Sequence, residues 1–312
     1  MTRILLGDNQ YGKAETHIVR VTKAGPEAGR AQGHTPTTPS RRPQRRGLHD
    51  IKDMTVSVAL AGDFASTHLT GDNSKVVPTD TQKNTVFAFA KQSPVGEVEE
   101  FALRLARHFV SDYDSVQRAR VSIAEQPWAR IRAGGRPHPH AFERAGSEKR
   151  LTAVTCTRNS EWVVSGLSEL TLLKSTGSEF WGYSKDRYTT LPETRDRVLA
   201  TAIDARWRYT RADIDWAAAH AEARRVLIET FATQHSLSLQ QTLYMMGEAV
   251  LQARPEIAEI RFSMANKHHF VVDLKPLGLE NDNEVFYASD RPYGLIEGTV
   301  TRDDAPPADH AW

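Results

Sequence analysis

Residues 266–274 have the sequence Asn-Lys-His-His-Phe-Val-Val-Asp-Leu, which joins a polar segment to an apolar one. From residue 268 to residue 274, β-branched and aromatic side chains predict a β-strand. Asn266, Lys267 and His268 stand at its head, where burial without hydrogen-bond partners would cost free energy. The stretch therefore predicts a polar tip leading into a strand. Such a tip is either a solvated loop or part of a functional site.

Segments of similar composition predict that this strand belongs to a larger sheet. Residues 16–22 and 54–61 are β-rich with alternating character, so we expect them to pair as a hairpin. Residues 24–50 between them are rich in Gly, Pro, Ser, Thr and Arg, which predicts a flexible insertion. A phosphate- or nucleic-acid-binding arm is the weaker alternative, because the insertion has no aromatic residues for stacking. Further strands are predicted at 85–90, 119–123, 151–157, 162–167, 170–173, 205–209, 257–264, 284–288 and 294–301.

Helices are predicted where the apolar period changes. Residues 97–110 place apolar side chains at three- and four-residue steps, which is typical of an amphipathic helix. Longer helices are predicted at 216–233 and 239–253, and Ser236 or Ser238 is expected to cap the second of these. Strands and helices thus recur in a similar order in the two halves of the chain. The pattern predicts an α+β protein with domains at 1–150 and 151–312, each an antiparallel sheet with helices on one face.

Composition limits the classes of function. The chain has 312 residues, 39% of them hydrophobic, and a formal net charge of +1. This charge argues against broad electrostatic binding of nucleic acid or of a membrane surface. No apolar run approaches the ~18 residues that span a bilayer. We expect a cytoplasmic protein, because Cys156 has no cysteine partner and no signal peptide or peroxisomal tripeptide is recognisable.

Six segments spread along the chain resemble the urate oxidase (uricase) family. They are Tyr-Gly-Lys-Ala-Glu at 11–15, Pro-Thr-Asp-Thr-Gln-Lys-Asn-Thr-Val at 78–86, Gly-Ser-Glu-Phe-Trp-Gly at 177–182, Tyr-Thr-Thr-Leu at 188–191, Asn-Lys-His at 266–268 and Asp-Arg-Pro-Tyr-Gly-Leu-Ile at 290–296. The resemblance implies two tandem tunnelling-fold (T-fold) domains per chain. It also implies a homotetramer that forms a tunnel-shaped barrel, with active sites at subunit interfaces. The chain departs from the family at 24–50, where a short connection is usual.

The implied reaction is the oxidation of urate by O₂ and water to 5-hydroxyisourate and hydrogen peroxide, with neither a metal nor an organic cofactor. By resemblance, the catalytic proton relay consists of Lys13, Thr79 and His268. The residues implied to bind urate and oxygen are Thr79, Asp80, Phe180, Arg197, Leu239, Gln240 and Asn266. Leu239 stands where the family often has valine. This difference is small, because the position is implied to offer its backbone.

The residue types suit a planar purine anion. Arg197 offers a flat guanidinium fork for two acceptors and a negative charge. The Gln240 amide both donates and accepts, as a purine edge does, and Phe180 supplies a stacking face. Because the urate dianion can reduce oxygen directly, the protein mainly has to move protons. A lysine, a threonine and a histidine can form that chain.

Each residue type also has a simpler explanation. Lys13 could be a solvated side chain, Thr79 could cap a turn, and Arg197 could form a surface ion pair with Asp196 or Glu193. The neighbours His268 and His269 invite a metal site, as does His-Pro-His at 138–140. We predict no metal site, because successive side chains in a strand point to opposite faces.

Two alternatives from other classes remain open on sequence grounds. A related tunnelling-fold enzyme could act on a pterin or a guanine-like ring, but such enzymes typically anchor the ring with a glutamate, and several use zinc. A purine-binding protein without catalytic activity would not need Lys13 or His268. Oxidation of urate by metal-free protein in air would distinguish among the three.

Overall fold

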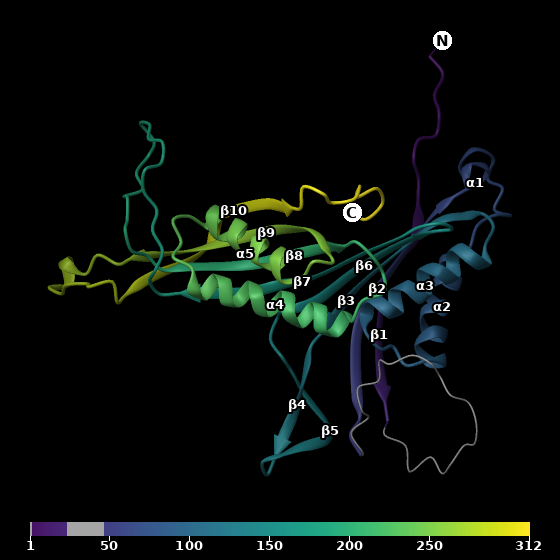
Figure 1. The fold of residues 1–312 in the computed structure, drawn as a ribbon, viewed down its shortest axis with the longest axis horizontal. Coiled ribbons are helices and arrows are strands. Elements are labelled where there is room, and N and C mark those ends of the chain that lie inside the picture. Colours follow the sequence, from purple (N-terminus) through teal and green to yellow (C-terminus); the bar gives the residue numbers. More distant parts are fainter. Residues whose placement is uncertain (1, 24–46) are drawn as a thin grey trace. The chain divides into compact units, whose positions relative to one another are not determined.

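The computed structural model describes residues 2–23 and 47–312, so residues 24–46 of the expected insertion lie outside the described part. The chain forms two compact units (Figure 1). The first unit contains Met1–Ser165, Arg211–Ala217 and Ala308–Trp312, and the second contains Gly166–Thr210 and Ala218–Pro307. The division into duplicated domains at 1–150 and 151–312 stays a prediction.

The sheet of the first unit has the strand order β1-β2-β3-β6. Its strands are β1 (Tyr11–Thr22), β2 (Asp50–Gly62), β3 (Val116–Gln126) and β6 (Lys149–Thr157). Each neighbouring pair is antiparallel, which confirms the predicted hairpin of β1 and β2. Met54, Val56, Val58 and Leu60 alternate along β2 and are all buried, so this strand crosses the core.

The helices of the first unit are α1 (Ala65–Thr70), α2 (Thr79–Gln92) and α3 (Val98–Asp112). The predicted helix at 97–110 corresponds to α3, which packs against β3 and β6. The strand predicted at 85–90 is wrong, because these residues belong to α2. Gln82, Val86 and Ala90 are the buried residues of α2 and recur every four positions, which is a helical spacing. The β-propensity of single residues had hidden this period.

A small separate sheet and the C-terminal segment complete the first unit. Strands β4 (Trp128–Ala133) and β5 (Arg136–Arg144) form an antiparallel hairpin that the sequence analysis did not predict. Ala311 is buried in a cluster with Ala153 and Val164. The Arg120 guanidinium donates to the carbonyl oxygen of Ala311 over 2.9 Å. The last residues of the chain are thus part of this unit's core.

The sheet of the second unit has the strand order β7-β8-β9-β10. Its strands are β7 (Glu161–Lys174), β8 (Leu199–Tyr209), β9 (Ile257–Val271) and β10 (Phe286–Thr301). Strand β7 belongs to this unit from Gly166 onward. The β8–β9 and β9–β10 pairs are antiparallel. Helices α4 (Trp216–Thr233, from Ala218 in this unit) and α5 (Leu239–Ala253) end where the sequence predicts, and a short 3₁₀ helix spans Lys275–Leu277. Helix α5 packs on β9 and β10, and the Ser238 hydroxyl caps it by accepting from the Gln241 N–H over 3.1 Å.

Strand lengths in the second unit differ from expectation. The segments predicted at 257–264 and 268–274 merge into one strand, β9, which ends at Val271, so residues 272–274 lie outside it. Asn266, Lys267 and His268 are therefore inside a strand, and the prediction of a polar tip is wrong. Similarly, 162–167 and 170–173 merge into β7, which continues through Glu169 at a φ of 60°. In β10 the pairing with β9 is interrupted between Ser289 and Gly294. None of the helices in the described part of the chain is long and apolar enough to cross a membrane.

Candidate active site

Lys13 lies on β1 of the first unit, in a segment that local packing defines closely. Gly12 precedes it and must be a glycine, because an added Cβ would lie 1.8 Å from the carbonyl oxygen of Val58 on β2. Glu15 follows with a φ of 55°, and its N–H donates to the Ser57 hydroxyl over 2.9 Å. The β1–β2 register shifts between Lys13 and Thr16. Lys13 thus lies between the close contact of Gly12 with Val58 and the β-bulge that precedes Thr16.

Thr79 and Asp80 form the exposed first turn of α2 in the same unit, after Pro78. Hydrogen bonding to the Lys83 ammonium and its positive charge lower the pKa of Asp80, with smaller contributions from Asn84 and Lys13. The contribution from Lys13 indicates that its amine lies near this turn. Within the described ranges, no side chain bonds the Thr79 hydroxyl. Backbone N–H groups in a first helical turn have no partner within their own helix.

In the second unit, Arg197 lies over the ring of Phe180, with 5.1 Å between its Cζ and the ring centroid. Its backbone N–H donates to the Ser178 carbonyl over 2.9 Å, and its Nε donates to the Ser178 hydroxyl over 3.2 Å. Burial lowers the pKa of Arg197. The ring of Tyr183 stacks on Phe180 at 4.8 Å, so one aromatic face is already covered.

Arg197 does not form the surface ion pair considered above. Glu193 accepts from Lys185 over 3.0 Å and from the Gly182 N–H over 3.1 Å. Asp196 accepts from the Thr176 hydroxyl over 2.7 Å. No carboxylate among residues 2–23 and 47–312 pairs with Arg197. Its positive charge therefore remains uncompensated.

Buried hydroxyls link Arg197 to the start of α5. Ser178 forms a bridge with Ser236: the Glu179 N–H donates to the Ser236 carbonyl over 2.7 Å. The Ser236 and Thr242 hydroxyls are 2.6 Å apart, and both bond the carbonyl of Ser238. This seryl network (Ser178, Ser236, Ser238 and Thr242) fixes the first turn of α5. Leu239, the buried first residue of that turn, and the exposed Gln240 are held by this network.

Asn266 and His268 lie two residues apart on β9 and therefore share one face of the sheet. Asn266 pairs with Thr201 of β8 and Gly294 of β10, and His268 pairs with Ser289. Burial lowers the pKa of His268, and the charges of Arg197 and His269 lower it further. Neutral imidazole is therefore favoured at His268.

The structure therefore groups the predicted site residues into two sets. Lys13, Thr79 and Asp80 belong to the first unit, and the second set (Phe180, Arg197, Leu239, Gln240, Asn266 and His268) belongs to the second unit. Tyr11 and Ser178 hold members of these sets, and neither was predicted from the sequence as a functional residue. Both lie inside the quoted motifs, but nothing in their residue type distinguishes them from ordinary polar residues.

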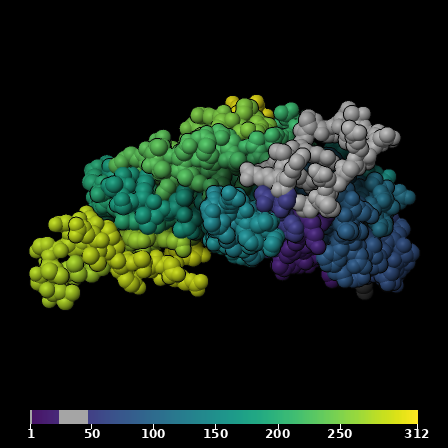
Figure 2. Space-filling model, turned by 90° about the horizontal axis from the view of Figure 1, so that it is seen from below, coloured from purple at the N-terminus to yellow at the C-terminus, as the bar shows by residue number. Residues whose placement is uncertain are grey.

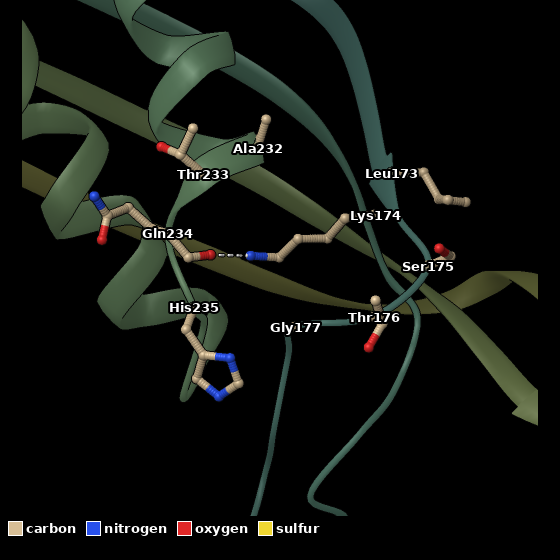
Figure 3. A pocket seen from close by; sticks show the side chains of 9 residues that line it. All are labelled: Leu173, Lys174, Ser175, Thr176, Gly177, Ala232, Thr233, Gln234 and His235. Carbon is tan, nitrogen blue, oxygen red and sulfur yellow. Dashed lines mark hydrogen bonds between the residues drawn. The ribbon is translucent and has the colours of Figure 1, made fainter.

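Two other features contain none of the predicted site residues. A hollow of about 510 Å³ is lined by residues 173–177 and 232–235 (Figure 3). Lys174 reaches across it and donates to the carbonyl of Gln234 over 2.6 Å, next to the C-terminal end of α4. The rings of His138 and His140 touch at 4.7 Å. In the part of the chain that the structure describes, His, Cys, Asp and Glu form no group of three or more that could hold a metal ion.

Both units are α+β, and the second presents the guanidinium of Arg197 over an aromatic ring, an arrangement that suits a planar anion. A family model described as "Uricase" matches residues 9–155 and 163–297. The uricase of Arthrobacter globiformis is 47% identical over 99% of this chain and 93% of its own, and that of Cyberlindnera jadinii is 39% identical over 96% and 97%. A crystal structure of the Arthrobacter globiformis uricase superimposes with a TM-score of 0.87 at 46% identity, covering 98% of each chain.

A crystal structure of a uricase from Bacillus fastidious matches with a TM-score of 0.76 at 26% identity, over 95% of this chain and 94% of that one. The chain belongs to the uricase family. The tunnelling fold that the sequence motifs imply is thereby confirmed, as is the resemblance itself.

Proposed function

We propose that this protein catalyses the oxidation of urate by O₂ and water to 5-hydroxyisourate and hydrogen peroxide, a step of purine degradation. Membership of the uricase family supports this activity. The observation that carries it is the position of Arg197, whose uncompensated charge lies over Phe180 and helps to lower the pKa of His268. The pterin and binding-protein alternatives lose their support, because the family match extends over both halves of the chain.

Binding of urate and oxygen is assigned to the members of the second set other than His268, together with Thr79 and Asp80 of the first set. The guanidinium of Arg197 would donate to two adjacent acceptors of the anion, and the Gln240 amide would pair with the opposite edge. Phe180 would supply a stacking surface for the ring beside Arg197. Thr79 and Asp80 would add the N–H groups of a first helical turn. Asn266, on the same face of β9 as His268, would orient oxygen.

Lys13, Thr79 and His268 are assigned to proton movement. Urate gives up two electrons and O₂ receives them, together with two protons, to form hydrogen peroxide. Water supplies the oxygen atom that joins the ring at C5, and its protons have to be carried away. A lysine, a hydroxyl that both accepts and donates, and a neutral histidine can pass these protons along. We propose that the protein needs no metal and no organic cofactor for this.

The working unit is proposed to be a homotetramer with active sites at subunit interfaces. Strands β1 and β10 each have one sheet neighbour, and such edges are open to a further strand. The segment from β9 to β10, yellow at the left of Figure 2, carries large apolar side chains that are exposed. They include Phe270, Leu277, Leu279, Tyr287 and Leu295. Exposed apolar patches of this kind mark interaction surfaces. We place the protein in the cytoplasm, since its lone buried thiol suits a reducing compartment.

The direct test mixes metal-free protein with urate in air and follows the ultraviolet absorbance of urate together with peroxide. One peroxide is expected per urate consumed, with no gain on adding metal ions. An anaerobic sample controls for oxygen dependence. Arg197→Ala should weaken urate binding. Arg195→Ala is the control and should leave urate binding unchanged, because it removes a neighbouring arginine that is paired with Glu179. Urate that persists in air under all metal conditions would refute the proposal.

A further inference from the structure

Tyr11 begins the Tyr-Gly-Lys segment, and its hydroxyl forms two hydrogen bonds with the main chain of one residue that is far away in the sequence. The hydroxyl accepts from the N–H of Val77 over 2.8 Å and donates to the carbonyl of the same residue over 3.2 Å. The two residues are 66 positions apart. Val77 is buried, so this hydroxyl satisfies main-chain groups that water does not reach.

The contact joins the two segments that carry the first set. Val77 is followed by Pro78, the cap of α2, and by Thr79, the first residue of that helix. Lys13 lies two residues after Tyr11 on β1, and side chains two positions apart point to the same face of a strand. The charge of Lys13 reaches Asp80, which agrees with this placement.

Further contacts hold both residues of the Tyr11–Val77 contact in place. The Tyr11 ring meets Phe64 edge to face at 4.9 Å, and Phe64 is fully buried. Gln82 of α2 also donates to the carbonyl of Val77, over 3.2 Å, so the helix itself is tied to the same residue. On the other side of Lys13, the bulge at Glu15 is held by the Ser57 hydroxyl. The relay lysine is thus placed by residues that need not touch urate.

We propose that Tyr11 is a positioning residue that holds Lys13 against Thr79 at the start of α2. This inference rests on the proposed function, because it assigns Tyr11 a role in the relay of that reaction. Without the hydroxyl, the start of β1 loses its two hydrogen bonds to Val77, which precedes α2. The distance between the Lys13 amine and the Thr79 hydroxyl is then set only by the surrounding packing.

Tyr11→Phe tests this, because phenylalanine keeps the ring against Phe64 and removes only the hydroxyl. We expect kcat to fall about 10- to 100-fold, since displacing a reacting group by about 1 Å can cost that much. KM should stay within about twofold, because Arg197 and Gln240 still bind the substrate. Thr152→Val is the control: it removes another buried hydroxyl bond of the first unit, the 3.0 Å bond to the carbonyl of Val164. It should lower the melting temperature and leave kcat unchanged.

The double variant Tyr11→Phe/Lys13→Met separates positioning from general stability. If Tyr11 acts through Lys13, the double variant has about the same kcat as Lys13→Met alone. Losses that multiply would overturn the proposal, as would a Tyr11→Phe enzyme with wild-type kcat or a defect confined to KM. Failure of the wild-type protein to oxidise urate would refute the proposed function instead. The two failures are therefore distinguishable.

Discussion

The Nε of Arg197 is held by a hydroxyl, which leaves the charge of the guanidinium uncompensated. A carboxylate in the place of Ser178 would neutralise the guanidinium and compete with the urate anion. The seryl network orients Arg197 without compensating its charge, because a hydroxyl accepts a hydrogen bond and carries no charge. In the proposed function, this arrangement orients the guanidinium before urate binds, so less orientation entropy would be lost on binding.

Ser178→Ala should therefore weaken urate binding more than turnover. The guanidinium loses its fixed acceptor, and hydrogen bonds to charged groups contribute about 1.5–3 kcal/mol, so KM should rise about tenfold or more. The change in kcat should be small. Steady-state kinetics checks this, with Ser111→Ala on the exposed end of α3 as the control. An unchanged KM would show that Arg197 does not need the hydroxyl.

Substitutions of Lys13 and Thr79 should show the reverse pattern to Ser178→Ala: kcat should fall strongly and KM should change little. Positioned acid–base groups contribute about 10²–10⁴-fold in rate, so Lys13→Met and Thr79→Ala should each lower kcat strongly. KM should change much less, because Arg197 remains. The double variant should lose far less than the product of the single losses, since the residues act as one unit. Multiplicative losses would show that they bind urate independently and relay nothing.

His268 should make the folded protein sensitive to acid. Its pKa is lowered in the folded state, so the unfolded chain binds a proton first as the pH falls below about 6.5. The stability contributed by neutral His268 is complete above that pH and is lost below it. The melting temperature of the wild type should fall more steeply between about pH 7 and pH 5 than that of His268→Gln. His140→Gln controls for loss of an exposed imidazole. Parallel curves of melting temperature against pH for the wild type and His268→Gln would contradict the predicted role of His268.

At the scale of elements, the start of β1 shows how one short segment can set a reacting group. Gly12 allows contact with β2, and the register shift before Thr16 ends the regular pairing just after Lys13. Bulges of this type re-aim side chains and are common beside active sites. The element therefore has few tolerated sequences, because its backbone and its chemistry are fixed by the same residues.

Gly12→Ala should damage this element. The new methyl group would meet a main-chain carbonyl at 1.8 Å, so the strands have to separate. Overpacking typically costs about 1–3 kcal/mol. The melting temperature should fall by several degrees, and kcat should fall with it as Lys13 moves. Gly7→Ala is the matched control, because nothing lies within 4 Å of its added Cβ. Equal melting temperatures for the two variants would contradict the close contact.

An element could be predicted from the sequence when the features that determine it, such as caps and apolar periods, lie within the element itself. Helices α4 and α5 were predicted to the residue, because caps and apolar periods are local. Helix α2 was mistaken for a strand at 85–90, since only tertiary packing reveals that Val86 and Ala90 share a buried face. The site residues came from motif resemblance. Their supports, Tyr11 and Ser178, depend on partners distant in sequence and need the folded chain to be recognised.

At the scale of the whole molecule, a division of the site between subunits makes a quantitative prediction. Lys13→Met and Arg197→Ala, each strongly impaired by itself, should regain activity when they are dissociated and reassembled together. A shared site needs an intact Lys13 from one chain and an intact Arg197 from another. Random mixing then restores about a quarter of the sites in a symmetric assembly. Mass spectrometry should verify the mixed oligomers, and inactivity of those oligomers would rule out shared sites.

The burial of Ala311 in the first unit has a consequence for synthesis on the ribosome. Most of the first unit has been translated by Ser165, yet its core includes residues from the very end of the chain. At about 5–20 residues per second, the ribosome needs on the order of ten seconds to make the residues in between. During that time the nascent first unit lacks Ala311, which packs with Ala153 and Val164 and accepts a hydrogen bond from Arg120. Its final packing is therefore completed only after the second unit has been made.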